Sequence, residues 1–483
     1  MKIYLKKWSI SLALIGSFLP ALSQWSTGSL PFKTARHGVE FLNPEEVIIA
    51  GGQVGNSGSS QNISDNAIIY NVNTHSWISS SMNTPRLEPI MVRGDSGVYV
   101  IGGASAWGDV NGNGWKIENT METYKNGSWT EFSIPFQTMD GNAVHVGGKI
   151  IVAGGMSYWR WDSSDGANIE GTSLLWIYDE ADKTWTSRFS SDGRFFSAAA
   201  SDGEIAVFVG GLWIQDSIPG DHLDGLYQSG AYEIYNSATN SWSSGYLPSG
   251  HNRSRIVGCY CNNLFVFVGG SRANGVGSNL VNIYDGQDWS HTDIEFSGAR
   301  AVEDCATAGN KILFAGGGRW RYETWYNNTT RSDLIDVFDA DSKSFSRDTL
   351  ERSLQDFKMA GYNGKAVLAG GVNYVGTEWT SYKEVYVFED SSFVNVGIQI
   401  DDNQKEVSIF PNPTSGDLRF FSRDLIEKIE VYNLHGEEII RIQNYDGRNN
   451  LSYHFSKSGF FIARIFFRGS EKIEYKKFSV VTH

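Results

Sequence analysis

The sequence predicts an all-β protein, a seven-bladed β-propeller followed by a small C-terminal β-sandwich. A doubled glycine recurs seven times with a period of roughly 50 residues. An apolar run precedes each pair, and a long loop, an aromatic strand and a second aromatic position follow it, with no helical periodicity in between. After the last repeat, about 80 residues show the period-two alternation of short strands. The glycine pairs are Gly51-Gly52, Gly102-Gly103, Gly154-Gly155, Gly210-Gly211, Gly269-Gly270, Gly316-Gly317 and Gly370-Gly371.

Each repeat is expected to form four strands, which in the first repeat are 36–42, 46–50, 67–72 and 76–80. The glycines end the second strand, where a Cβ atom would block a close approach of backbone. A large ring on the fourth strand is expected to fill the wedge between neighbouring blades. We therefore assign the glycines and these rings to the scaffold. The rings are Trp77, Trp129, Trp185, Trp242, Trp289, Phe345 and Phe393.

This order of glycines and aromatics closely resembles the kelch repeat, over about residues 25–397. The resemblance implies a ring that is closed by strands from both ends of the domain. The segment from Gln24 to Thr27 mirrors Ser76-Trp77. We expect it to complete the last blade, with or beside the strand at Phe393.

The N-terminal residues 1–23 have the pattern of a secretory signal peptide, with three lysines, a short apolar stretch and small residues before a cleavage point after Ser23. A buried first helix is the alternative. No transmembrane segment is expected, because the apolar stretch is too short and none follows it. The propeller domain is expected to span residues 24–397. Its charge is about −17, because the whole chain carries −14, residues 1–23 contribute +3 and residues 398–483 are balanced. Nucleic acid is therefore a poor candidate partner.

A polar linker is expected at 398–406, followed by a sandwich domain at 407–483. Its sequence opens on Pro411-Asn412-Pro413-Thr414-Ser415-Gly416, has a Tyr432-Asn433-Leu434 turn and contains Gly459-Phe460-Phe461 before a basic last strand. These features resemble the C-terminal sorting domain of the type IX secretion system (type A). The resemblance implies export through the periplasm and the outer membrane, with the protein secreted or attached to the cell surface. An accessory β-domain packed on the propeller is the alternative.

The loops after the glycines are rich in Trp, Tyr and Arg, and together with the loops that join the blades they share one face of the disc. Exposed Trp and Arg are typical of binding hot spots, and flat rings stack on sugars. Mutual burial of the loop aromatics is the alternative. Eight of the sixteen tryptophans lie in these loops, Trp107, Trp115, Trp159, Trp161, Trp213, Trp320, Trp325 and Trp379. The candidate ligand-binding residues there are Trp159, Arg160, Trp161, Trp213, Arg319, Trp320, Arg321, Trp325 and Trp379.

An arginine recurs sixteen residues before the glycines, as Arg86, Arg194, Arg253 and Arg300, with Arg36 one residue closer. Such a ring of arginines suits a carboxylate or sulfate ligand at the mouth of the channel, for which Arg86, Arg194 and Arg300 are the candidates. The same side chains are equally suited to bonding carbonyl groups between blades.

Two further features concern metals and thiols. Asp109, Asn111 and Asn113 begin a calcium-loop pattern, but Thr120 stands where the bidentate Glu belongs, so a plain polar loop is the alternative to calcium. No other cofactor is expected. The three cysteines, Cys259, Cys261 and Cys305, exclude a disulfide framework and are expected to be buried free thiols, with a bridge from Cys305 as the alternative.

Catalytic signals are weak, since no nucleophile elbow and no histidine pair with metal-ligand spacing occurs. Our leading hypothesis is a propeller that binds a glycan or an extracellular protein through the loop face. The alternatives are a carbohydrate-active enzyme, such as the sialic acid mutarotases that also carry arginines around a kelch channel, and a structural component of the cell surface. A copper oxidase related to galactose oxidase is disfavoured, because the Cys, Tyr and His ligand set is not assembled.

Overall fold

The computed structural model describes residues 24–55, 62–108, 114–162, 166–171, 173–190, 196–214, 226–272, 276–293, 299–318, 332–375, 378–390, 407–410, 417–422, 425–433, 438–444, 450–455, 459–469 and 473–480. Residues 1–23, for which the sequence predicts a signal peptide, lie outside these ranges. The chain divides into two compact units at Phe393/Val394. Every regular element in the described ranges is a strand, so none of them holds a helix of the length and apolarity that a membrane crossing requires.

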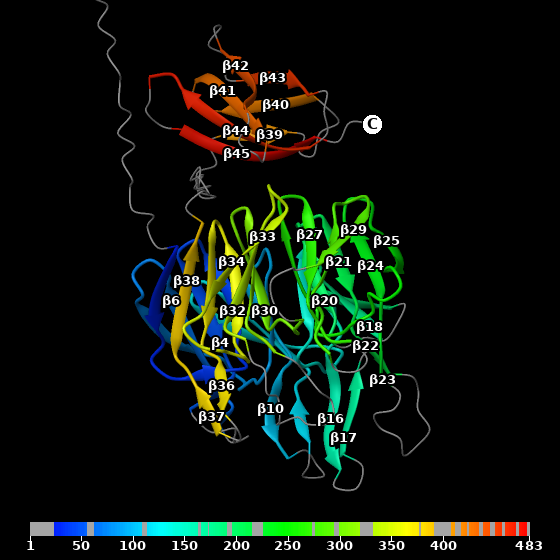
Figure 1. Cartoon of the computed structure of the whole chain (residues 1–483). Coiled ribbons are helices and arrows are strands. Elements are labelled where there is room, and N and C mark those ends of the chain that lie inside the picture. The colour runs from blue at the N-terminus through cyan, green and yellow to red at the C-terminus, as the bar shows by residue number, and fades with distance from the viewer. Residues whose placement is uncertain are drawn as a thin grey trace, which may run out of the picture. The chain divides into compact units, whose positions relative to one another are not determined.

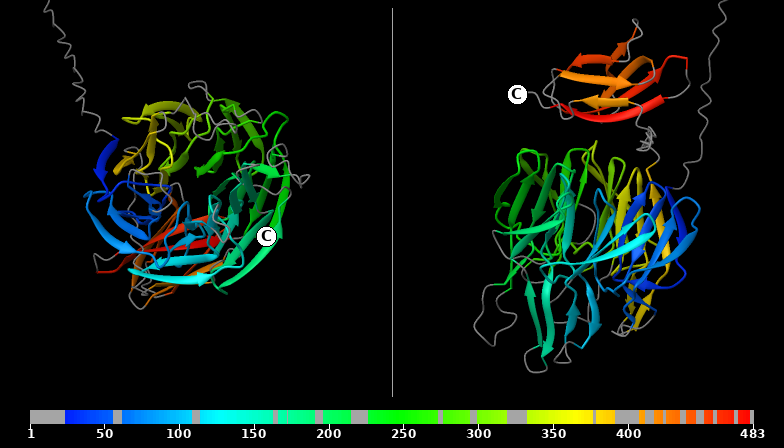
Figure 2. Two further views of the ribbon diagram at one scale, coloured as in Figure 1. Left: turned by 90° about the horizontal axis from the view of Figure 1, so that it is seen from below. Right: turned by 180° about the vertical axis from the view of Figure 1, so that it is seen from behind.

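Within its described residues, unit 1 is built of seven four-stranded antiparallel sheets around an axis (Figures 1 and 2), as the sequence predicts. Blade 1 consists of β3 (Gly38–Asn43), β4 (Glu46–Ala50), β6 (Asn66–Asn71) and β7 (Trp77–Ser81), and blade 2 of β8 (Ile90–Arg93), β9 (Val98–Ile101), β12 (Thr120–Lys125) and β13 (Ser128–Ser133). Blade 3 consists of β14 (Asn142–Val146), β15 (Lys149–Ala153), β18 (Leu174–Asp179) and β19 (Thr184–Phe189), and blade 4 of β20 (Ala198–Ser201), β21 (Ile205–Val209), β24 (Ala231–Asn236) and β25 (Ser241–Tyr246).

Blades 5 to 7 have the same order of strands, and the last takes its outer strand from the N-terminus. Blade 5 consists of β26 (Val257–Cys261), β27 (Leu264–Val268), β28 (Leu280–Tyr284) and β29 (Trp289–Asp293), and blade 6 of β30 (Asp304–Ala308), β31 (Lys311–Ala315), β32 (Leu334–Asp339) and β33 (Ser344–Thr349). Blade 7 consists of β34 (Lys358–Tyr362), β35 (Lys365–Ala369), β38 (Glu384–Glu389) and β1 (Trp25–Ser29).

The N-terminal strand closes the ring as expected. β1 pairs with β38, and Trp25 stands opposite Phe388 in the register that Trp129 and Tyr124 have in blade 2. The two rings meet edge-on at 5.1 Å between centroids. The Trp25 Nε1–H also donates to Asp348 Oδ2 at 2.6 Å, which ties the closing strand to blade 6. The other residue proposed for this position, Phe393, lies outside the described ranges.

The core lies between the blades. An apolar cluster fills each of the seven junctions between consecutive blades, including the junction of blade 7 with blade 1. Trp129, Trp185, Trp242, Trp289 and Phe345 pack against these clusters, which confirms their role in the wedge. The prediction that Trp77 fills a wedge is wrong, because 42% of its surface is exposed and it contributes little to that packing.

Short hairpins extend from one face of the propeller (Figure 1), where the loops after the glycines were expected. Their strands are β10 (Ala104–Trp107) with β11 (Trp115–Ile117), β16 (Met156–Asp162) with β17 (Gly166–Gly171), β22 (Leu212–Ile214) with β23 (Leu226–Gln228), and β36 (Val372–Val375) with β37 (Glu378–Ser381). A fifth pair is β2 (Thr34–Ala35) with β5 (Gln53–Val54). We call this side the hairpin face.

Unit 2 has two antiparallel sheets whose apolar side chains share a core that includes Leu418, Ile429 and Ile465. One sheet holds β39 (Val407–Phe410), β40 (Asp417–Ser422) and β43 (Asn450–His454). The other holds β42 (Glu438–Gln443), β41 (Ile426–Asn433), β44 (Gly459–Phe467) and β45 (Ile473–Val480).

Candidate functional site at the channel mouth

The repeated glycines shape the hairpin face. All fourteen have positive φ, as expected of residues chosen for a left-handed backbone. Gly317 requires glycine for two reasons: its φ is 84°, and a Cβ atom would come within 1.9 Å of the Ala301 carbonyl oxygen. The second glycine also links blades, since the Gly52 N–H donates to the Arg86 carbonyl oxygen of blade 2 at 2.7 Å. These positions are therefore structural.

Three of the recurrent arginines, Arg86, Arg253 and Arg300, are also structural. Arg86, Arg253 and Arg300 are buried. Each donates to the carbonyl oxygen of the first glycine of its own blade, at 2.7 Å, 2.7 Å and 2.9 Å. Each also bonds the third strand of that blade, through Glu122, Asn282 and Asp336 respectively.

This arrangement corrects both interpretations of the arginines. The carbonyl bonds are made within blades, whereas the sequence suggested bonds between them. The guanidinium groups of Arg86 and Arg300 are engaged by carboxylates and carbonyls, so we do not retain these two residues as ligand contacts. Arg194 lies outside the described residues.

Another set of side chains, which the sequence analysis missed, surrounds the mouth of the channel on the hairpin face. One residue precedes the innermost strand of each blade, and we call the set the mouth ring. Six of the seven have φ between 50° and 57°, where non-glycine residues are uncommon and often functional. The mouth ring consists of Arg36, Glu88, Asp140, Phe196, Arg255, Glu303 and Asp356.

Backbone hydrogen bonds pass from blade to blade along this ring. The Arg36 N–H donates to the Asp356 carbonyl oxygen, the Glu88 N–H to that of Arg36, and the Asp140 N–H to that of Glu88, at 2.8 to 3.2 Å. The Arg255 N–H donates to the Phe196 carbonyl oxygen at 2.9 Å. These bonds hold the ring residues at one level of the channel.

The charged side chains of the ring interact with one another. Arg36 Nε lies 3.4 Å from Glu88 Oε1 and 3.4 Å from Asp356 Oδ2. The Arg255 guanidinium carbon lies 3.9 Å from the centroid of the Phe196 ring. Part of each ion pair is open to solvent, since 28% of the Arg36 side chain and 19% of the Glu88 side chain are exposed. A ligand at the mouth can therefore reach both charges.

Burial raises the pKa of three of the ring carboxyls, those of Glu88, Asp140 and Glu303. It brings the pKa of Glu88 to about 7 and that of Glu303 to about 8, and it also raises that of Asp140. Lys358, on the innermost strand of blade 7, has the opposite balance: burial opposes its charge, but Asp304 and other carboxylates outweigh that effect and raise its pKa. At neutral pH the mouth thus holds protonated acids, carboxylates and cations together.

Trp379 is the described ligand-binding candidate that reaches this ring. Its ring centroid lies 5.3 Å from the Arg36 guanidinium carbon, and its Nε1–H donates to Ser381 Oγ at 2.9 Å. Farther out on the hairpins, Trp107 and Trp115 meet edge-on at 4.8 Å, with 38% of Trp107 exposed. Tyr227 is 51% exposed. The hairpin aromatics therefore include both packed and exposed rings.

The remaining candidates are only partly described. Trp159, Arg160 and Trp161 lie on β16, and Trp213 lies on β22, of which the backbone but not these side chains is described. Arg319, Trp320, Arg321, Trp325 and the proposed calcium ligands Asp109, Asn111 and Asn113 lie outside the described residues. Thr120, the twelfth position of the calcium pattern, accepts a hydrogen bond from Arg86 Nη2 at its Oγ1. The three cysteines are free thiols, of which Cys261 and Cys305 are buried, as expected, while Cys259 is half-buried.

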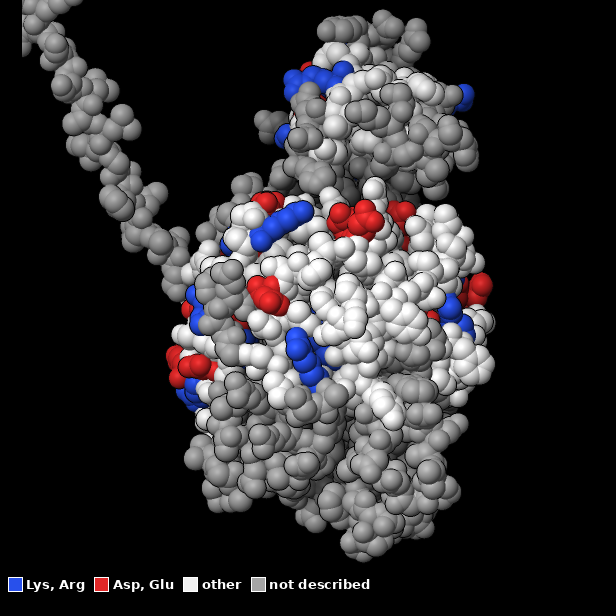
Figure 3. Space-filling model, turned by 45° about the vertical axis from the view of Figure 1, so that its right-hand side comes forward, with Lys and Arg blue, Asp and Glu red and all other residues white. Residues whose placement is uncertain are grey.

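Charged side chains on the outer wall have a different arrangement. Figure 3 shows acidic and basic residues scattered between uncharged stretches of the described surface. The mouth ring, in contrast, gathers charges from several blades into one place. This convergence distinguishes it as the candidate site.

The comparisons support the kelch repeat. No protein-family model matches the chain. The chain is 24% identical over 221 residues to kelch repeat and BTB domain-containing protein 2 of Homo sapiens and of Pongo abelii, a match that covers 41% of this chain and 31% of those proteins. It thus spans about a third of the length of these relatives.

The solved structure of YjhT is also similar, with a TM-score of 0.48 and 15% identity over 66% of this chain and 99% of that one. Taken together, the doubled glycines, the four-stranded blades and the similarity to curated kelch-repeat proteins support the kelch repeat as the unit of this propeller.

Proposed function

We propose that this chain is an exported kelch propeller that binds a hydroxyl-rich ligand, a glycan, at the mouth ring on its hairpin face. The observation that supports this most is the convergence of Arg36, Glu88 and Asp356 at distances of 3.4 Å in a half-buried channel mouth. Sugar hydroxyls both donate and accept hydrogen bonds. A site with protonated carboxyls, carboxylates and guanidinium groups side by side can satisfy both roles.

Trp379 supplies the apolar part of the proposed site. It lies beside Arg36 at the mouth, and an indole face in this position can stack on a sugar ring. Most pockets for small ligands combine a few polar groups with such aromatic surface. The net charge of −14 argues against polyanionic ligands such as nucleic acid.

A glycan array with the full chain, followed by calorimetry on the best ligand, tests this proposal. We expect Trp379→Ala and Asp356→Asn each to weaken binding at least about tenfold, as the loss of one buried contact of about 1.4 kcal/mol would do. Trp77→Ala is the matched control, because it removes an exposed ring from the outer strand of blade 1. Unchanged binding in both mouth variants would exclude the ring, and a protein ligand would appear as pull-down without glycan binding.

A second candidate is an enzyme that acts on carbohydrate, such as a mutarotase, and one observation favours it. The pKa of Glu303 is about 8 and that of Glu88 about 7, which lies in the range that suits general acid–base catalysis at neutral pH. The raised pKa of Lys358 keeps its amine protonated, which disfavours Schiff-base chemistry.

Anomer exchange followed by NMR on the ligands found by the array separates the two candidates. Binding without accelerated exchange supports a binding protein. Exchange that is lost in Glu303→Gln, while affinity remains, supports the enzyme.

The route of export is part of the proposal. The pattern of residues 1–23 and the sorting-domain motifs after residue 406 support secretion by a signal peptide and the type IX machinery. Mass spectrometry of the exported protein is expected to show Gln24 as the first residue. Deletion of residues 398–483 is expected to leave the propeller in the periplasm, and its normal export would contradict the role of the tail.

A structural role at the cell surface is the third hypothesis. Binding to purified envelope material, compared with binding to soluble polysaccharides, distinguishes a structural component from a receptor for free glycans.

A further inference from the structure

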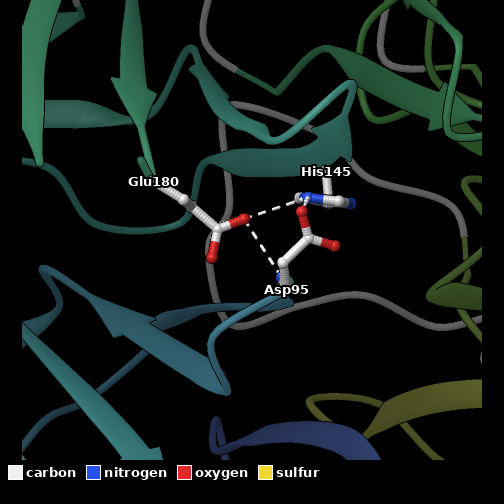
Figure 4. A group of neighbouring side chains, drawn as sticks. All are labelled: Asp95, His145 and Glu180. Atoms are coloured by element: carbon white, nitrogen blue, oxygen red, sulfur yellow. Dashed lines mark hydrogen bonds and ion pairs between the residues drawn. The ribbon is translucent and has the colours of Figure 1, made fainter. Parts of the chain in front are cut away.

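A second group of polar side chains lies away from the mouth ring, at the ends of the blades opposite the hairpins. Figure 4 shows its three members, Asp95, His145 and Glu180. Asp95 is in the turn between β8 and β9 of blade 2. His145 is on β14, the innermost strand of blade 3, and Glu180 follows β18 of the same blade. The group therefore bridges two neighbouring blades at the ends of their sheets.

The donor atoms of this group have the spacing of metal ligands. His145 Nε2 lies 3.0 Å from Glu180 Oε2 and 3.5 Å from Asp95 Oδ2. All three donor atoms lie within 4.8 Å of one another. Tetrahedral zinc, with bonds of about 2.0–2.1 Å, separates its ligands by roughly 3.3 Å. The two distances from His145 lie on either side of that value.

Hydrogen bonds orient the carboxylate from behind. Glu180 Oε1 accepts from the Ser96 N–H at 3.0 Å and from the Tyr99 O–H at 2.8 Å. Glu180 Oε2 accepts from the Asp95 N–H at 3.0 Å and faces His145. Such outer-sphere bonds are what metal sites use to fix their ligands. A cation here replaces only the interaction with His145, because the other bonds reach Glu180 from the turn and from Tyr99 on β9.

Solvent access completes the site. Glu180 is almost fully buried, His145 is 23% exposed and Asp95 is 68% exposed at the side chain. A cation can thus enter from solvent past Asp95, and water can fill the remaining coordination position. One imidazole and two carboxylates form a donor set that suits zinc and its first-row neighbours better than calcium or magnesium.

We propose that Asp95, His145 and Glu180 bind one zinc-like divalent transition-metal ion, which joins blade 2 to blade 3. The site is independent of the mouth ring, and its three ligands come from the turn and strand ends that the blade junction brings together. The ion crosslinks the two blades at the ends of their sheets, beyond the apolar cluster that packs between them.

The test is a zinc titration of the full chain, purified without a polyhistidine tag, in competition with a chromophoric chelator. We expect one equivalent of Zn²⁺ to bind. His145→Gln and Asp95→Asn are expected to weaken binding at least about tenfold, since even loss of an outer-sphere partner costs about 10–100-fold. Asp182→Asn is the control, because it removes a nearby exposed carboxylate that is not part of the group.

Cobalt provides an independent readout. Co²⁺ is expected to give visible absorption bands of a low-coordinate site in the wild type and in Asp182→Asn, and to lose them in Asp95→Asn. If His145→Gln does not fold, Asp95→Asn still decides, because its side chain is largely exposed. Equal zinc affinity in the wild type and Asp95→Asn, or no saturable binding in the wild type, overturns the proposal. The group is then an ion-pair cluster that links blades 2 and 3 without a metal.

Discussion

The buried arginines offer a quantitative test, because the structure gives them different partners. Arg300 donates to Asp336 Oδ2 at 2.6 Å, and no part of the Asp336 side chain is exposed. Arg300→Met removes the nearer of two cations that face this carboxylate and leaves Arg347 Nε at 3.5 Å from Asp336 Oδ1. The expected cost is therefore at the lower end of the about 3–5 kcal/mol that breaking a buried ion pair costs. Arg253 bonds the neutral Asn282 at 2.7 Å, and burial lowers the pKa of Arg253 to about 9. Arg253→Met leaves no orphaned charge, so it is expected to cost only about 1–3 kcal/mol.

Urea denaturation followed by tryptophan fluorescence measures both free energies of unfolding. The double variant Arg300→Met/Asp336→Leu is expected to recover at least half of the loss, because an apolar pair of similar volume replaces the ion pair. Equal costs for the two arginines, or no recovery in the double variant, would refute the assignment of the cost to the lost Arg300–Asp336 ion pair. Loss of ligand binding with unchanged stability would restore the arginines as ligand contacts.

Three further predictions concern the closure, the channel and the glycines. Trp25→Phe removes the hydrogen bond to Asp348 and is expected to lower the free energy of unfolding by about 1.5 kcal/mol; a double-mutant cycle with Asp348→Ala checks that the two losses are not additive. Glu303 has a pKa of about 8 in the folded chain against 4.5 ordinarily, so it binds its proton more tightly when folded. Stability is therefore lost as pH rises from about 4.5 to about 8, and the unfolding midpoint of Glu303→Gln should depend less on pH in that window. Gly317→Ala should lower Tm far more than Gly203→Ala. Both glycines have a positive φ, and an alanine in that conformation destabilises the fold by about 1–2 kcal/mol. Of the two, only Gly317 would also place its new Cβ atom against the backbone of a neighbouring segment. Similar Tm values would contradict the close-approach argument.

The fold followed from the sequence to a considerable depth, and the failures have physical causes. The blade number, the first four strand ranges and the closing strand at Trp25 were predicted, because glycine pairs and strand alternation are local patterns. Trp77 was assigned to a wedge, yet it is 42% exposed. Its position in the repeat matches that of Trp129, so only the packing of the neighbouring blade could show the difference.

The candidate site was predicted less well. The recurrence of arginine suggested a ligand site at the channel mouth. The side chains of Arg86, Arg253 and Arg300 instead bond groups of their own blades. The mouth ring had a signal in the sequence: Glu88, Asp140, Phe196, Arg255 and Asp356 each stand fourteen residues before the first glycine of a pair. Because the residue type varies from blade to blade, the recurrence is of position alone and is easily overlooked.

The sequence by itself determined the repeat, the number of blades, the strand that closes them and the side from which the loops extend, since each depends on the spacing of residues along one segment. The tertiary structure decided which charged groups meet. Arg36, Glu88 and Asp356 come from blades 1, 2 and 7, and Asp95 and His145 from blades 2 and 3. The distances between these groups and the raised pKa values of Glu88 and His145 arise only when the ring closes, because closure brings distant segments together and withdraws water from the space they share.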